Sequence, residues 1–334
     1  MAQTAGVSVG TVSNVLNRPA LVSPATRERV LSVIEELNFV RNASARQLRE
    51  GKVRTVGAVV LDIANPFFTE MARGIEDRLA TEDFTLMLSS SDGDPEREGR
   101  YLRLFEEQGV HGVLVSPSRG TRGNIDKLRR HGVPVVLLDY RSQAGDVSSV
   151  SVDDVAGGTL AVRHLLERGH RRIAFLNGPL SIQQCVDRRD GAVAAFQSAG
   201  LDPADGLLEI PMPALNAAAG DVAMEGLLDL DEASRPTAVF CVNDLTALGA
   251  MRCARRAGLS IPEDMAFVGY DDIQYSAELM TPLTSVRQAM HRMGWTAADL
   301  LLRSEDGPEQ VVFEPELIVR ESSGPVRERP TRSP

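Results

Sequence analysis

From residue 53 onward, short apolar runs alternate with longer stretches in which apolar residues recur at helical spacing. The short runs predict strands, and the periodic stretches predict helices. The predicted strands are 55–61, 84–89, 112–116, 134–138, 148–152, 172–176, 237–242, 265–270, 283–287 and 311–319. The predicted helices lie near 66–81, 95–108, 122–131, 153–168, 187–199, 216–229, 244–257 and 288–303. This alternation predicts an α/β fold built from doubly wound parallel sheets.

The number of strands suits two such subdomains better than one. We expect a body over residues 53–321. Its first subdomain takes in about 53–153 plus 285–305, and its second takes in about 154–282 plus 308–321. The tail over 322–334 is rich in Pro, Arg and Ser, and we expect it to be disordered.

Residues 1–50 have a different pattern, which predicts a small all-α head. Gly6 supplies the positive φ of a sharp turn, and Ser8 can cap the helix that follows. Val12, Val15 and Leu16 share the face that would pack inward. Little chain precedes the turn, so the helix expected before it looks truncated.

A second helix of the head is expected after Ser23, which can cap it, with Pro24 at the first helical position. Its apolar face is formed by Val30, Val33, Ile34 and Leu37. Residues 41–52 are polar, with Leu48 as their one large apolar residue. This segment is either a linker or a hinge that becomes helical on binding.

Composition narrows the function. The chain is 43% hydrophobic and 25% charged, which is ordinary for a soluble protein. It has no run of 18 apolar residues and no secretory signal, and its three cysteines form no CxxC pair, so we expect a cytoplasmic protein. Residues 1–54 carry eight Lys and Arg against four Asp and Glu, a net +4. The remainder carries 28 against 42, a net −14. A basic head on an acidic body is expected of a DNA-binding arm on a sensor.

The first helix of the head adds to this interpretation. Its outer face carries short polar residues, which suit the major groove, where Asn can pair with adenine. The candidate DNA-binding residues here are Ser8, Val9, Gly10, Thr11, Ser13, Asn14 and Asn17. A helical hairpin without a DNA role is the alternative. The same run matches the nucleophile elbow G-x-S-x-G, but the buried strand that this motif requires is missing.

Several motifs together resemble the lactose-repressor (LacI/GalR-type) family of bacterial transcription regulators. They are GVSVGTVSNVLNRP, VSPATRERVLSVIEELNFVRNASARQL, DIANPFF, SDGDPEREGRYL, GHRRIAFLNGP, VNDLTALGAM, FVGYDD and PLTSVRQ. The resemblance covers about residues 1–323 and implies a body similar to periplasmic sugar-binding proteins. It places Val9, Gly10 and Asn14 at base edges. It also implies that Leu48, with Ala45 beside it, enters the minor groove as an apolar wedge.

The resemblance also implies an effector pocket at the carboxyl ends of the strands, where ligands of parallel sheets bind. Carboxylates, amides and a guanidinium in one cleft suit sugar hydroxyls, which both donate and accept hydrogen bonds. The candidate residues are Asp62, Phe67, Phe68, Asp139, Arg141, Gln184, Arg188, Leu215, Asn243, Asp271 and Gln288. Gln184, Leu215 and Ile182 align with positions that vary with the ligand.

These observations favour a homodimeric repressor of carbohydrate-metabolism genes that a small sugar releases from a palindromic operator in double-stranded DNA. A purine-type co-repressor is an alternative effector, because Phe67 and Phe68 could stack on a base. An intracellular sugar sensor with impaired DNA binding is the other alternative. We expect no catalytic residues, no cofactor and no metal, because the chain has no P-loop, no HExxH and no metal spacing among its five histidines.

Overall fold

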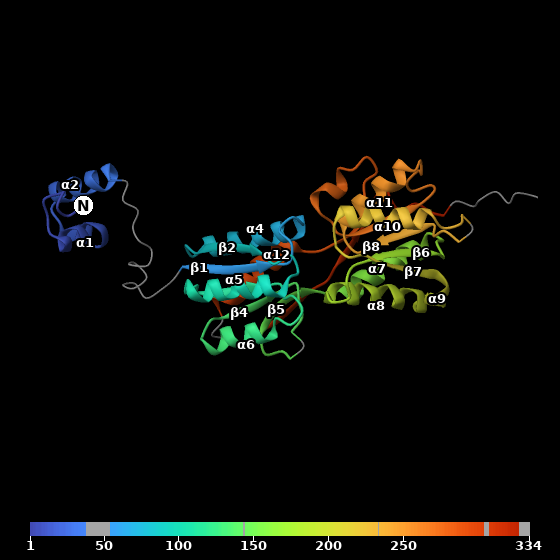
Figure 1. The fold of residues 1–334 in the computed structure, drawn as a ribbon, viewed down its shortest axis with the longest axis horizontal. Coiled ribbons are helices and arrows are strands. Elements are labelled where there is room, and N and C mark those ends of the chain that lie inside the picture. The colour runs from blue at the N-terminus through green and yellow to red at the C-terminus, as the bar shows by residue number, and fades with distance from the viewer. Residues whose placement is uncertain (38–53, 143, 233, 304–306, 327–334) are drawn as a thin grey trace, which may run out of the picture. The chain divides into compact units, whose positions relative to one another are not determined.

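The computed structural model describes residues 1–37, 54–142, 144–232, 234–303 and 307–326. The chain divides after residue 53 into two units, which are described separately. The first unit, the head, contains α1 (Val9–Asn17), the 3₁₀ helix η1 (Pro19–Leu21) and α2 (Pro24–Glu36) (Figure 1). Its small core consists of Ala5, Val12, Val15, Val30 and Val33.

The local signals that were expected to set the helices of the head are confirmed. Gly6 has a φ of 62°, and the Ser8 hydroxyl oxygen accepts a hydrogen bond from the Thr11 amide at 3.0 Å. Ser23 caps α2, with a proline in its first turn. One expectation is wrong, because Leu37 is 48% exposed and does not join the apolar face of α2.

The second unit, the body, holds two six-stranded sheets with a lobe around each. The strand order in lobe 1 is β11-β5-β4-β3-β1-β2, and every pairing is parallel. The strands are β1 (Thr55–Val60), β2 (Thr85–Ser90), β3 (Gly112–Val115), β4 (Val135–Leu138), β5 (Ser148–Val152) and β11 (Gln310–Phe313). The helices are α4 (Pro66–Ala80), α5 (Pro95–Glu107), α6 (Arg122–Arg130) and α12 (Met290–Leu302).

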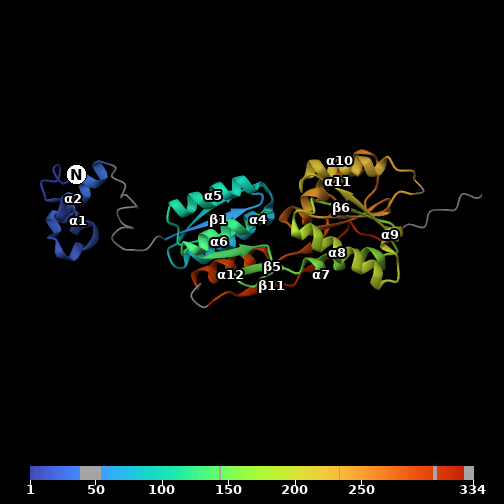
Figure 2. The same ribbon diagram turned by 60° about the horizontal axis from the view of Figure 1, so that its bottom comes forward.

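Both faces of the lobe 1 sheet are buried. Alternate residues of β1 show this, since Val56 and Ala58 pack with α4 and α12, whereas Val59 packs with α5 and α6. Figures 1 and 2 show these helix pairs on opposite faces of the sheet. This is the expected doubly wound arrangement, which leaves the carboxyl ends of the strands free to form a site.

The strand order in lobe 2 is β12-β10-β9-β8-β6-β7, with only β12 antiparallel to its neighbour. The strands are β6 (Ile173–Asn177), β7 (Leu207–Pro211), β8 (Ala238–Cys241), β9 (Ala266–Asp271), β10 (Thr284–Arg287) and β12 (Glu316–Ile318). The helices are α7 (Asp154–Glu167), α8 (Gln183–Ser198), α9 (Pro203–Gly206), α10 (Ala217–Leu228), α11 (Asp244–Arg256) and η2 (Gln274–Ala277). A Cβ on Gly158 would lie 2.2 Å from the Arg188 backbone oxygen, so this glycine lets α7 and α8 approach closely.

The predicted boundary between the subdomains differs from the structure near the C-terminus. The predicted strand 311–319 is two strands in different sheets, because Glu314 and Pro315 interrupt it. β10 lies in the second sheet, although residues 285–305 were expected in the first. β11 lies in the first sheet, although 308–321 were expected in the second.

Two further expectations are corrected. β7 was not predicted, because it is a half-exposed edge strand whose run contains Glu209. The tail that was expected to be disordered begins with ordered residues. Ser322 is buried and accepts a hydrogen bond from the Thr284 amide at 2.8 Å. Among the residues with described positions, no helix has the length and apolar character needed to span a bilayer.

Candidate functional site

A cavity of about 670 Å³ lies where the carboxyl ends of the two sheets face each other. Lobe 1 supplies the segments that follow β1, β2 and β4, and lobe 2 supplies those that follow β6, β7, β8 and β9. Its size falls within the range of about 300–1,000 Å³ that is typical of small-molecule sites.

The structure brings most of the predicted effector residues to this cavity. The predicted residues that line it are Asp62, Phe67, Phe68, Asp139, Gln184, Arg188, Leu215, Asn243 and Asp271. Ile182 lines it as well. Arg141 does not line it, and its side chain is exposed to solvent. Gln288 lies behind the wall, where its amide donates to Asp271 Oδ1 at 2.7 Å.

Arg188 is the buried cation of the cavity. Its Nε donates to Asp154 Oδ1 at 2.8 Å, and its Nη1 donates to the backbone oxygen of Val242 at 2.6 Å. The guanidinium lies 3.6 Å from the centre of the Tyr270 ring. Burial alone lowers the pKa of Arg188, but the charge of Asp154 and neighbouring groups outweighs this and raises it. The guanidinium is therefore charged and held in one orientation.

Two carboxylates lie at the carboxyl ends of strands: Asp139 directly follows β4, and Asp271 is the last residue of β9. Their φ angles of 50° and 102° are rare for residues other than glycine, so the surrounding structure fixes both side chains in place. Burial raises the pKa of Asp271 to about 6, although Arg188 and hydrogen bonds from Gln288 and Asn65 oppose the rise. Burial and the charge of Asp154 raise the pKa of Asp139 well above its ordinary value, against the effect of Arg188.

Asp139 also carries a hydrogen bond between the lobes. The amide of Gln184, on α8 of lobe 2, donates to Asp139 Oδ2 at 2.8 Å and to the Asp139 backbone oxygen. The other carboxylate oxygen, Oδ1, is buried and has no partner among the described residues. A buried acceptor without a donor is costly, so this oxygen suits a ligand hydroxyl.

Three predicted residues have structural roles at the cavity wall. Asn243 caps α11 by accepting from the Thr246 amide, and it donates to the Leu215 backbone oxygen at 3.0 Å. Phe67 and Phe68 are buried edge to face, with ring centres 4.9 Å apart. Both rings line the cavity with only a small part of their surface exposed.

Four polar residues of lobe 1 line the cavity without having been predicted. Asn65 caps α4 and also bonds to Asp271 across the cleft. Ser90 donates to Asp92 Oδ1 at 2.6 Å, and Arg97 pairs with Asp92. A search at the carboxyl end of β2, like the one that found Asp139 at β4, would have found both Ser90, the last residue of β2, and Asp92, which follows shortly after.

One group in the described part of the chain has metal-ligand spacing. The ligand atoms of Asp221, Glu225 and Cys253 lie within 4.8 Å of one another. Arg252 and Arg256 already pair with Asp221 at 2.6 and 2.9 Å, so these positive charges oppose a cation. All three cysteines are free and buried.

The predicted DNA-contacting residues of the head form part of its surface. Val9 is 77% exposed, and Gly10 and Asn14 are exposed beside it. The hydroxyls of Ser8 and Thr11 bond to each other at 2.9 Å in the helix cap, and Ser13 is half-buried. Nothing is described for the side chain of Asn17, and Ala45 and Leu48 lie outside the described residues.

Comparison with known proteins adds two family matches. Residues 1–42 match bacterial regulatory proteins of the lacI family, and residues 162–323 match a periplasmic binding protein-like domain. A curated relative from Aliivibrio fischeri (strain MJ11), named HTH-type transcriptional repressor PurR, is 35% identical over 96% of each chain.

Two solved structures resemble nearly the whole chain. A complex of the transcriptional regulator CelR with cellobiose is 36% identical, covers 96% of this chain and 98% of its own, and has a TM-score of 0.70. The lac repressor dimer bound to operator and the anti-inducer ONPF is 28% identical, covers 97% of each chain, and has a TM-score of 0.80.

Proposed function

The chain belongs to the lacI family of bacterial regulatory proteins, and from this premise we propose that a sugar bound in the cleft releases it from its operator. It is a DNA-binding transcriptional repressor, as its relatives are. The genes that it controls would be those of carbohydrate metabolism. The CelR–cellobiose complex, which is similar over nearly the full length, supports a sugar as the effector.

The observation that carries this proposal is the pairing of Asp139 and Arg188 in one cavity. Asp139 offers a buried oxygen without a partner, and Arg188 keeps a buried positive charge beside it. Neighbouring sugar hydroxyls can donate to the first and accept from the second. We assign Asp62, Asn243 and Asp271 to the same ligand as supporting polar groups.

We propose that the exposed face of α1 reads the operator. Val9, Gly10 and Asn14 would contact base edges, with Ser8, Thr11, Ser13 and Asn17 around them. Ala45 and Leu48 are assigned to the minor groove by the family resemblance. A palindromic operator requires a two-fold protein, so we propose a homodimer, in line with the similar lac repressor dimer.

The bond between Gln184 and Asp139 suggests how the effector acts. A sugar hydroxyl that donates to Oδ1 of Asp139 would bond to the same carboxylate as the Gln184 amide, which donates to Oδ2 and joins the two lobes. Sugar binding would thereby alter the relation between the lobes and so the affinity for operator. Such coupling is reciprocal, so operator DNA must weaken sugar binding by the same factor.

A thermal-shift screen of pentoses, hexoses and purines tests the effector. A ligand at 100 times its dissociation constant should stabilise the protein by about 2.7 kcal/mol. A purine that binds while no sugar does would overturn the proposal. A gel shift on palindromic sites upstream of the protein's own gene, with and without the sugar, tests the release. Sugar binding without any operator binding would favour an intracellular sensor instead.

A further inference from the structure

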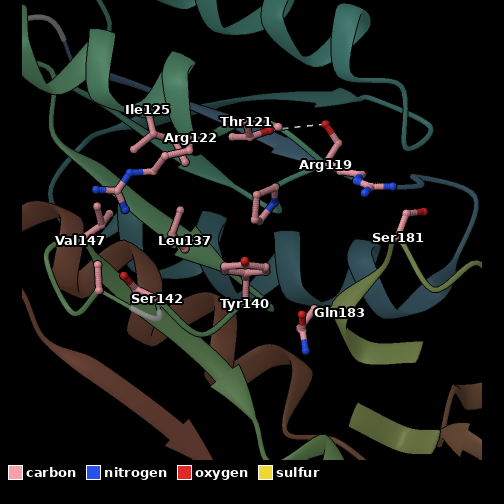
Figure 3. Close-up of a pocket in the computed structure, with 14 residues that line it drawn as sticks. Arg119, Thr121, Arg122, Ile125, Leu137, Tyr140, Ser142, Val147, Ser181 and Gln183 are labelled. Atoms are coloured by element: carbon pink, nitrogen blue, oxygen red, sulfur yellow. Dashed lines mark hydrogen bonds between the residues drawn. The ribbon is translucent and has the colours of Figure 1, made fainter. Parts of the chain in front are cut away.

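A second cavity, of about 550 Å³, opens at the same edge of the lobe 1 sheet (Figure 3). It is lined by the segments that follow β3 and β4, and lobe 2 contributes Ser181 and Gln183. None of the residues predicted from the sequence to bind an effector lines it.

The two cavities are neighbours along one boundary. Ser181 lines both of them. Adjacent residues of each lobe divide between them. Asp139 and Gln184 line the first cavity, whereas Tyr140 and Gln183 line the second. The hydrogen bond between Asp139 and Gln184 therefore lies at the boundary between the two cavities. Ser181 is exposed and lines both cavities, and no hydrogen bond among these boundary residues separates the cavities on its side.

The lining of the second cavity suits a sugar ring. Tyr140 is half-buried, and an aromatic ring can cover the apolar face of a pyranose. The hydroxyls of Ser118, Ser142 and Ser181 and the amide of Gln183 can meet sugar hydroxyls. Figure 3 shows the side chains of both lobes around the cavity.

Charge argues against a phosphate in this place. Arg122 is already paired with Asp126 at 3.1 Å and with Asp146. The buried carboxylate of Glu98 lies just beneath, where it accepts from the Ser118 amide at 2.6 Å. Arg119 is the one arginine of the lining that forms no ion pair with a described residue, and it is exposed.

We propose that the effector is a disaccharide, with one ring in the first cavity and its second ring in the second cavity against Tyr140. The linkage between the rings would pass Ser181. This inference rests on the proposed sugar-binding function and specifies the size of the ligand.

Calorimetric titration of the full chain with matched sugars tests the inference. The pairs are glucose with cellobiose, glucose with maltose, galactose with lactose, and xylose with xylobiose. For the pair that binds, the disaccharide should bind at least about tenfold more tightly than the monosaccharide. Tyr140→Ala should remove most of that gain and leave monosaccharide binding unchanged. Tyr275→Ala, at an exposed tyrosine that lines neither cavity, is the matched control and should change neither affinity.

Arg119→Ala provides a second variant at an exposed position, where folding is not at risk, and it should weaken only the disaccharide. The inference is wrong if mono- and disaccharide bind equally, or if Tyr140→Ala weakens both alike, and the proposed function survives either result. It is also wrong if glucose 6-phosphate exceeds glucose in affinity by a larger factor than any disaccharide exceeds its matched monosaccharide. If no sugar binds at all, the inference and the proposed function fail together.

Discussion

The two lobes contribute to the cleft in different ways. Lobe 2 supplies polar groups that are buried and hydrogen-bonded within the lobe, such as Arg188, Asp271 and Asn243. Lobe 1 supplies Asp62, Ser90 and Arg97, which are partly exposed, and of its described polar residues that line the cavity only Asp139 and Asn65 are buried. This difference indicates that lobe 2 is organised before a ligand arrives, whereas most of the lobe 1 rim is free to adjust to it.

The largest effect that would test this difference between the lobes is expected from Arg188→Ala. Removing the guanidinium leaves Asp154 and Asp271 buried without their counter-charge, which should destabilise the protein by about 3–5 kcal/mol. Urea unfolding measures the loss, and sugar binding should be lost with it. Arg188→Lys keeps the charge but not the planar guanidinium, so its free energy of unfolding should lie between that of the unchanged protein and that of Arg188→Ala. A loss below about 1 kcal/mol would show that lobe 2 does not depend on this cation.

The pH dependence of stability offers the next test. Burial raises the pKa of Asp271 to about 6 and, together with the charge of Asp271, raises that of Asp244 to about 7. Both exceed the value of about 3.9 for an unfolded Asp, so the folded state holds more protons between these limits. Stability from these groups is therefore full below about pH 4 and falls as the pH rises to about 7.

Asp271→Asn isolates this effect. In Asp271→Asn, the decrease in unfolding free energy between pH 4 and pH 8 should be smaller by about 3 kcal/mol, as measured by urea unfolding at intervals across this range. Asp92→Asn in lobe 1 is the control, because the hydrogen bond from Ser90 lowers the pKa of Asp92, and it should leave the fall intact. An unchanged slope in Asp271→Asn would mean that this carboxyl is not perturbed.

How much of this could be predicted from the sequence depends on which contacts were local. Asp139, Arg188 and Asp271 were predicted because strand ends and a family motif mark them. The placement of Gln288 behind Asp271 depends on the pairing of β9 with β10, which no local pattern encodes. The placement of β11 in the first sheet and of β12 in the second could not be predicted for the same reason, since an apolar run does not show which strand it will pair with.

Gln184→Ala tests the boundary between the lobes. Without this amide, the buried Asp139 carboxylate loses its side-chain donor, which should cost about 1–3 kcal/mol in unfolding free energy. Bound sugar should reduce that loss, because its hydroxyls can donate in place of the amide. Gln197→Ala is the control, because Gln197 is an exposed glutamine of α8 that lines neither cavity. A loss that sugar does not reduce would mean that the ligand does not donate to Asp139.

The smallest effect is expected from Arg97→Ala in lobe 1. Arg97 pairs with Asp92 at the exposed rim, where ion pairs contribute little, so the midpoint of urea unfolding should not change. Sugar affinity, measured by titration, should fall by only about two- to fivefold, because the rim adjusts around the ligand. A loss as large as that of Arg188→Ala would erase the difference between the lobes. It would mean that the partly exposed polar residues of lobe 1 are as firmly organised before binding as the buried polar groups of lobe 2.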